Sequence, residues 1–225
     1  PMNTIIDFAD TLNHTEIPVE VRKNSISQIK ANSNLLLKMI GNIIELSKVQ
    51  TGQISINKTD CHISEIFESI KPKVKNQLIL DEKNVEIEFI IDSKMGQNQV
   101  YTDTDRLEQI ILNLVDNALK HTSAGKIVVG SILSDSRPKH PEIEFYVKDT
   151  GSGLEKEQYE AIFNTFTKIE SKEKFFQGTG LGLSLSKNLV SILGGRMWVE
   201  SEEGKGSTIY FTIPFEQSNK KDVLD

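Results

Sequence analysis

Residues 105–122, DRLEQIILNLVDNALKHT, carry two patterns on one predicted helix. Apolar residues recur at helical spacing and predict a buried stripe, which consists of Leu107, Ile110, Ile111, Leu114, Val115 and Ala118. Asn113, Asn117 and Lys120 fall within about 60° of one another on a different face. A solvated face would favour Glu, Lys or Gln, because asparagine is a poorer helix former. The pattern leaves two interpretations, a solvated face or a bound polar ligand such as Mg²⁺ and phosphate.

The sequence around this helix alternates between apolar and polar residues, as strands with one packed face do. The alternating stretches are 84–92, 126–133, 142–149 and 207–214, and residues 196–201 form a further predicted strand. Helical patterns occupy about 64–80, 103–121, 155–163 and 180–193. Helices interspersed with such strands predict an α/β sandwich with a mixed sheet and a helical layer.

The N-terminal region has a different pattern. Residues 2–14 predict one helix and residues 19–50 a much longer one, joined by the turn TEIP at 15–18. The long helix carries an apolar seam of Ile29, Leu36, Met39, Ile43 and Leu46. The short helix cannot cover this seam alone, so we expect a homodimer that forms a four-helix bundle. The alternative is a long helix that packs on its own domain. The whole chain is therefore predicted to be α+β.

Composition excludes several classes of protein. The net charge of −6 argues against a nucleic-acid surface, which would be basic. A single cysteine, Cys61, cannot form an internal disulfide and favours a reducing compartment. We find no signal peptide and no run of about 20 apolar residues that could span a membrane. The sequence is equally that of a cytoplasmic piece of a membrane protein, with any membrane contact made by regions outside the chain.

The stretch FYVKDTGSGL, residues 145–154, places Asp149 at the end of a predicted strand and Gly151 and Gly153 in the turn after it. Glycines allow close approach of the backbone. A carboxylate only accepts hydrogen bonds, so it can accept from the exocyclic amine of adenine and repel the carbonyl oxygen of guanine. The alternative is an ordinary Asp-Thr-Gly turn between a strand and a helix.

Three glycines, Gly178, Gly180 and Gly182, lead into the helix of GTGLGLSLSKNLV, residues 178–190. The N–H groups and dipole of a helix N-terminus attract phosphate. The spacing matches neither a P-loop nor a Rossmann fingerprint, and a closely packed glycine turn is the alternative.

Between Gly153 and Gly178 lies a long polar stretch that is typical of a mobile lid over a ligand. It contains the lysines Lys168, Lys172 and Lys174 and, before them, Phe163 and Phe166. Phe163 is interpreted as a core anchor.

The order of these motifs resembles the ATP-binding domain of sensor histidine kinases, within the wider group of gyrase, the ninety-kilodalton heat-shock chaperone and the mismatch-repair ATPases. The motifs are Asn-x-x-x-Asn-x-x-Lys, Asp-x-Gly-x-Gly, Phe-x-x-Phe and Gly-x-Gly-x-Gly. "FNTF" at 163–166 departs from the commoner Phe-x-Pro-Phe, which leaves the stiffness of the lid open. By this resemblance, Asn117 holds Mg²⁺, Asp149 takes the adenine amine and Lys120 contacts phosphate.

The full nucleotide-binding set implied by the resemblance is Asn113, Asn117, Lys120, His121, Asp149, Gly151, Gly153, Phe166, Lys168, Gly178, Thr179, Gly180, Leu181 and Gly182. Asn113 supports the site and His121 borders the nucleotide. The glycines form the floor and rim around the phosphates. Lys168 matches a basic lid residue near the γ-phosphate.

The opening stretch PMNTIIDFADTL resembles the end of the family's dimerisation motif, His-Glu-x-Arg-Thr-Pro-Met/Leu-Asn-x-Ile. Pro1 matches the proline of this motif, which would place the phosphoacceptor histidine five residues earlier, off this chain. The Thr or Asn before that proline, used for removing phosphate from the partner, is missing too. His14 lies at the end of the first helix and is no substitute. We therefore expect a chain that dimerises and binds ATP without autophosphorylating, and label on His14 would contradict this.

The resemblance implies the catalytic core of a bacterial two-component kinase. Residues 1–52 are then a dimerisation hairpin without its phosphoacceptor segment, 53–216 the ATP-binding domain, and 217–225 a polar tail. The parent protein would transfer the γ-phosphate of Mg-ATP to a histidine and then to an aspartate of a response-regulator receiver. Two alternatives stay open. One is a dimeric scaffold with degenerate activity. The other is a hydrolytic ATPase. Asn113 argues against it, because those enzymes carry a glutamate base at this position.

Overall fold

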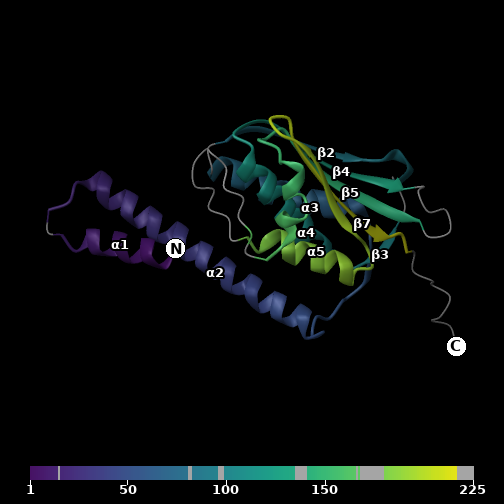
Figure 1. The fold of residues 1–225 in the computed structure, drawn as a ribbon, viewed down its shortest axis with the longest axis horizontal. Coiled ribbons are helices and arrows are strands. Elements are labelled where there is room, and N and C mark those ends of the chain that lie inside the picture. The colour runs from purple at the N-terminus through teal and green to yellow at the C-terminus, as the bar shows by residue number, and fades with distance from the viewer. Residues whose placement is uncertain are drawn as a thin grey trace. The chain divides into compact units, whose positions relative to one another are not determined.

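The computed structural model describes residues 1–14, 16–80, 83–95, 99–134, 141–165, 167 and 180–216. It divides into two compact units, Pro1–Ile54 and Ser55–Asp225 (Figure 1). No helix among the described residues is both long enough and apolar enough to span a membrane.

The first unit is a hairpin of α1 (Met2–Leu12) and α2 (Val19–Gln50). Each helix follows a proline, Pro1 or Pro18, whose carbonyl accepts the first helical hydrogen bond. Proline suits this position because its fixed φ fits the first turn and it has no N–H to satisfy. Gly52 follows α2 with a φ of 67°, the left-handed conformation that commonly ends a helix.

The second unit is built on a five-stranded sheet in the order β2-β4-β5-β7-β6. The strands are β2 (Asn84–Ile91), β4 (Ala124–Ser134), β5 (Glu142–Asp149), β6 (Met197–Glu202) and β7 (Gly206–Pro214). β2 runs parallel to β4, and the other neighbouring pairs are antiparallel. The sheet is therefore mixed, as predicted.

Three helices, α3 (Ile63–Leu80), α4 (Thr104–His121) and α5 (Gly182–Ile192), cover one face of the sheet (Figure 1). The inward-facing strand residues meet the apolar stripes of the helices, and Phe145 stacks on Phe211 with ring centroids 4.9 Å apart. The predicted stripe of α4 is buried throughout, with Leu107, Ile110, Ile111 and Leu114 fully shielded from solvent. The core thus fixes which face of α4 is left for other contacts.

The structure differs from the sequence prediction in short elements. Residues 155–163 do not form one helix but two single 3₁₀ turns, Lys156–Gln158 and Ala161–Phe163. A nine-residue stretch forms few helical hydrogen bonds to offset the free-energy cost of nucleating a helix. A second small sheet, β1 (Thr59–Cys61) paired with β3 (Val100–Thr102), was not predicted, because three residues are too few to show alternation. A 3₁₀ turn, Ser93–Met95, precedes β3.

Candidate functional site

Helix α4 is anchored at its N-terminus by Asp103. One carboxylate oxygen, Oδ1, accepts from the N–H of Arg106 at 3.0 Å and caps the helix. The other, Oδ2, accepts from the N–H of Asn57 at 2.8 Å. The segment that precedes β1 and the start of α4 are therefore held by one buried carboxylate.

Asn113, Asn117 and His121 follow one another at intervals of four residues, so they form a single stripe along α4. At one end, Asn113 Nδ2 donates to Ser186 Oγ of α5 at 3.3 Å. A Cβ placed on Gly182 would lie 3.9 Å from the amide group of Asn113. Asn117, in the middle of the stripe, is half-buried, and its side chain makes no hydrogen bond with the residues that the structure describes.

Asp149 lies at the end of β5 with only 5% of its surface exposed. Its Oδ1 accepts from the N–H of Gly151 at 2.8 Å and from the N–H of Ser207 at 3.3 Å. Burial raises the pKa of this carboxyl above its ordinary value, and these two hydrogen bonds act in the opposite direction. Both bonds fall on one oxygen, which leaves Oδ2 to accept from a ligand.

The loop after Asp149 packs directly on the last turn of α4. Ser152 donates its N–H to the carbonyl of His121 at 3.4 Å. A Cβ on Gly151 would lie 2.2 Å from that same carbonyl oxygen, so the close approach requires glycine. Gly153 has a φ of 70°, and an added Cβ would lie 2.1 Å from the carbonyl oxygen of Glu202. The predicted Asp-x-Gly-x-Gly motif is therefore joined to one end of the Asn113–Asn117–His121 stripe.

Two cations affect His121 at this junction. The pKa of its imidazole is lowered first by burial and then by the nearby charges of Lys120 and Lys83. The ordinary pKa of histidine is already near 6.5, so His121 is mainly neutral at pH 7. It can border a nucleotide through its ring but contributes little charge to phosphate.

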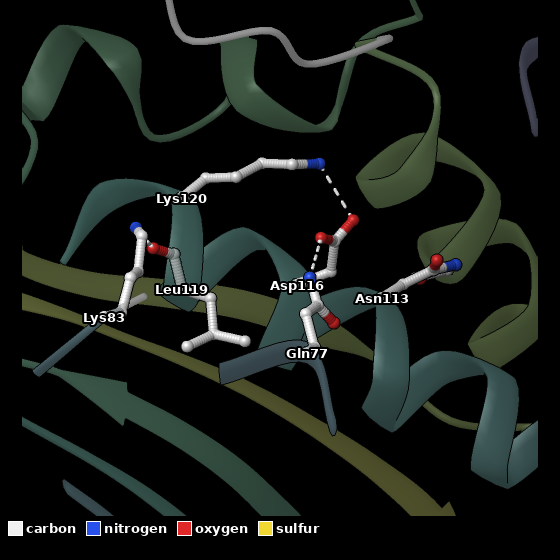
Figure 2. A network of polar contacts seen from close by, with 7 residues as sticks. Gln77, Lys83, Asn113, Asp116, Leu119 and Lys120 are labelled. Carbon is white, nitrogen blue, oxygen red and sulfur yellow. Dashed lines mark hydrogen bonds and ion pairs between the residues drawn. The ribbon is translucent and has the colours of Figure 1, made fainter. Parts of the chain in front are cut away.

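Lys120 lies close to the stripe but is engaged in an ion pair. Its Nζ is 2.8 Å from Asp116 Oδ2, and Gln77 of α3 donates to Asp116 Oδ1 at 3.0 Å (Figure 2). The sequence interpretation assigned Lys120 to phosphate and overlooked Asp116. The spacing of four residues between Asp116 and Lys120 is the signal that pointed to this pair.

Gly180, Leu181 and Gly182 form the start of α5. Gly180 has a φ of 67° and precedes the helix, whose first residue is Gly182. Leu181 is fully buried in the core, so its side chain is not available to a ligand. Four further predicted residues, Phe166, Lys168, Gly178 and Thr179, lie outside the described residues.

The structure adds contacts that sequence reasoning missed. Ser186 of α5 supports Asn113, and the N–H of Ser207 at the start of β7 supports Asp149. Neither follows a local motif, because each partner is separated by more than 50 residues from the group that it binds. The described residues contain no cluster of three or more His, Cys, Asp or Glu that could hold a metal. A bound cation would depend on the Asn117 amide oxygen together with ligand phosphate and water.

Comparison with known proteins gives consistent matches. Residues 102–217 match the family described as histidine kinase-, DNA gyrase B-, and HSP90-like ATPase. The chain is 36% identical over 216 residues to hybrid signal transduction histidine kinase B of Dictyostelium discoideum, covering 95% of this chain and 11% of that protein. It is 34% identical to the autoinducer 2 sensor kinase/phosphatase LuxQ of Vibrio vulnificus, covering 96% of this chain and 25% of that protein.

Solved structures agree with these sequence matches. Full-length ShkA in complex with AMPPNP has a TM-score of 0.73 at 25% identity, over 97% of this chain and 44% of that one. The catalytic domain of ThkA has a TM-score of 0.59 at 27% identity, over 71% of this chain and 96% of that one. The chain spans 11% and 25% of the length of the two curated relatives named above.

Proposed function

Because the chain belongs to the histidine kinase-, DNA gyrase B-, and HSP90-like ATPase family, we propose that it binds Mg-ATP as the core of a two-component sensor histidine kinase. In the protein that contains this core, a neutral histidine attacks the γ-phosphorus of ATP. A nitrogen–phosphorus bond forms, the bond to the bridging oxygen breaks and ADP leaves. An aspartate of a response-regulator receiver then takes the phosphoryl group. We place this reaction in the cytoplasm.

The hydrogen bonding of Asp149 is the observation that supports ATP most strongly. Two backbone N–H groups fix Oδ1, which leaves Oδ2 to accept from the exocyclic amine of adenine. Guanine would present a carbonyl oxygen to this carboxylate, and neither group could donate. A buried site with unmatched acceptors rejects the wrong base strongly. His121 lies next to the same loop and borders the base.

The remaining residues of the stripe and the start of α5 would hold the phosphates. Asn117 fits a magnesium ligand, since its amide is half-buried and makes no hydrogen bond within the described part of the chain. When bound, Mg²⁺ would reduce the negative charge on the phosphates. The backbone N–H groups at Gly180–Gly182 lie at the N-terminal end of α5, where the positive end of the helix dipole attracts phosphate. We extend this proposal to Phe166, Lys168, Gly178 and Thr179 on the motif alone.

Catalysis in this proposal is mainly positioning of the γ-phosphate and reduction of its charge. Asn113 cannot act as a general base, because an amide does not take a proton at neutral pH. Instead it donates a hydrogen bond to Ser186. This supports transfer to a histidine over direct hydrolysis by an activated water.

The helical hairpin supports a homodimer. Four apolar residues of α2 each expose between 46% and 67% of their surface: Leu37, Ile40, Ile43 and Ile44. Contiguous exposed apolar side chains on one helix are typical of a protein interface. The receiver partner is inferred from the family, in which ThkA has been solved in complex with the response regulator TrrA.

The proposal is tested with the natural gene product that contains this chain. Incubation with γ-³²P-labelled ATP and Mg²⁺ should give a phosphoprotein that is stable in base and labile in acid, as phosphohistidine is. Asn117→Leu should abolish the label, while Asn188→Leu, on the exposed side of α5, serves as a matched control that keeps it. Labelling that is acid-stable, or that survives in Asn117→Leu, would contradict the proposal.

A further inference from the structure

Asp116 and Lys120 form an ion pair on α4, with 2.8 Å between Asp116 Oδ2 and Lys120 Nζ. Gln77 of α3 donates to Asp116, so this carboxylate lies on the side of α4 that meets α3. At about 100° per residue, Asp116 lies roughly 100° around α4 from Asn117 but only about 40° from Lys120. Its carboxylate has 15% of its surface exposed and accepts from Gln77 and Lys120 on separate oxygens. Lys120, with 33% of its side chain exposed, reaches toward this carboxylate (Figure 2).

The main chain beneath this pair is fixed. Lys83 donates to the carbonyl of Leu119 (Figure 2) and, at 3.1 Å, to the carbonyl of Thr122. These groups lie in and just after the last turn of α4, where helix carbonyls lack partners and a cation is favourable. The loop at Gly151 packs on the carbonyl of His121 in the same turn. A change of partner by Lys120 would therefore need only a rotation of its side chain and no unwinding of the helix.

We infer that Asp116, held by Gln77, tunes nucleotide affinity by competing with phosphate for the ammonium group of Lys120. This inference rests on the proposed nucleotide site. An ammonium group at the end of a flexible four-carbon chain can leave a carboxylate for a phosphate. When Lys120 leaves Asp116, the free energy of the ion pair is lost. The net free energy gained from phosphate binding is reduced by that amount. Removing the charge of Asp116 then strengthens nucleotide binding, an outcome that simple damage to the fold would not produce.

The test compares the dissociation constant of Mg-ATP for the chain and its Asp116→Asn variant by isothermal titration calorimetry. The substituted amide oxygen can still accept from Gln77, so the link to α3 is preserved. A partly exposed ion pair one turn apart on a helix is weak, and we expect binding to tighten about two- to five-fold. In a Lys120→Met background, Asp116→Asn should change the affinity by much less.

Glu108→Gln is the matched control on the same helix. Glu108 accepts from Ser69 and Lys73 of α3 and is likewise a paired carboxylate, but its partners do not adjoin the stripe. The Glu108→Gln substitution should leave the affinity for Mg-ATP unchanged. Equal tightening in Glu108→Gln, unchanged or weaker binding in Asp116→Asn, or equal tightening with and without Lys120 would each overturn the inference while ATP binding stands. A wild-type chain that binds no ATP contradicts the proposed site itself and the inference with it.

Discussion

Gly151→Ala separates the loop of Asp149 from helix α4 without any strain in φ. The new Cβ would lie 2.2 Å from the carbonyl oxygen of His121, a backbone atom that cannot rotate away. Ordinary contacts begin near ~3.5 Å, so the loop and the helix must part by about 1 Å. Overpacking of this kind costs about 1–3 kcal/mol of stability. Because Asp149 and Asn117 would then be misaligned for one ligand, ATP affinity should fall at least about tenfold.

Gly194→Ala gives a matched control at the far end of α5. Gly194 has a φ of 86°, and an added Cβ would lie 3.2 Å from Pro214 Cγ. A left-handed conformation costs a residue other than glycine about 1–2 kcal/mol, similar to the loss expected for Gly151→Ala. This variant should lose stability but keep its ATP affinity.

The assay combines urea unfolding with calorimetric titration of Mg-ATP. The chain has one tryptophan, Trp198, which lies on β6, so its fluorescence reports the unfolding of the sheet unit alone. If Gly151→Ala retains both wild-type stability and wild-type ATP affinity, the close packing of the loop on α4 is wrong. If Gly151→Ala and Gly194→Ala weaken ATP binding equally, the effect is general destabilisation and the reasoning fails.

The pKa of Asp149 is raised in the folded chain, so as the pH falls this carboxyl is protonated before an exposed one. ATP affinity should then fall, whereas the contribution of this group to the free energy of unfolding should rise. ATP titrations and urea unfolding at several pH values check the two changes. Lys83→Met removes two hydrogen bonds at the end of α4 and should lower the unfolding free energy by about 1–2 kcal/mol, whereas Lys83→Arg should retain most of it; equal losses would contradict the capping role. Leu37→Ser with Ile44→Ser should shift a dimer to a monomer in sedimentation velocity, and an unchanged dimer would exclude this surface.

Periodic patterns predicted the fold well, because burial imposes them over many residues. The stripe of α4 and the alternation of β5 and β7 correspond to elements of the observed mixed sheet and helical layer. The resemblance to sensor histidine kinases is confirmed by the family match and by the relatives. The three-residue strands and the 3₁₀ turns carry no such period and were missed or assigned to the wrong element.

The site was predicted less completely than the fold. The stripe of Asn113 and Asn117 and the loop of Asp149 meet at His121 in the structure, but the nucleotide contacts themselves stay predictions. The partners Ser186 and Ser207 depend on the fold bringing distant segments together, so local sequence gives no signal for them. The competition at Lys120 depends on which of two nearby groups binds it, which a spacing rule alone does not decide.

Binding of ATP and GTP to the wild-type chain and to Asp149→Asn tests the central claim most directly. The substitution is nearly isosteric and removes a buried charge, so stability should be retained or increased. Loss of a charged hydrogen bond costs about 1.5–3 kcal/mol, and ATP affinity should fall about ten- to hundredfold. The account predicts that the wild-type chain prefers ATP to GTP and that Asp149→Asn loses this preference. Wild-type ATP affinity in a stably folded Asp149→Asn chain would contradict it.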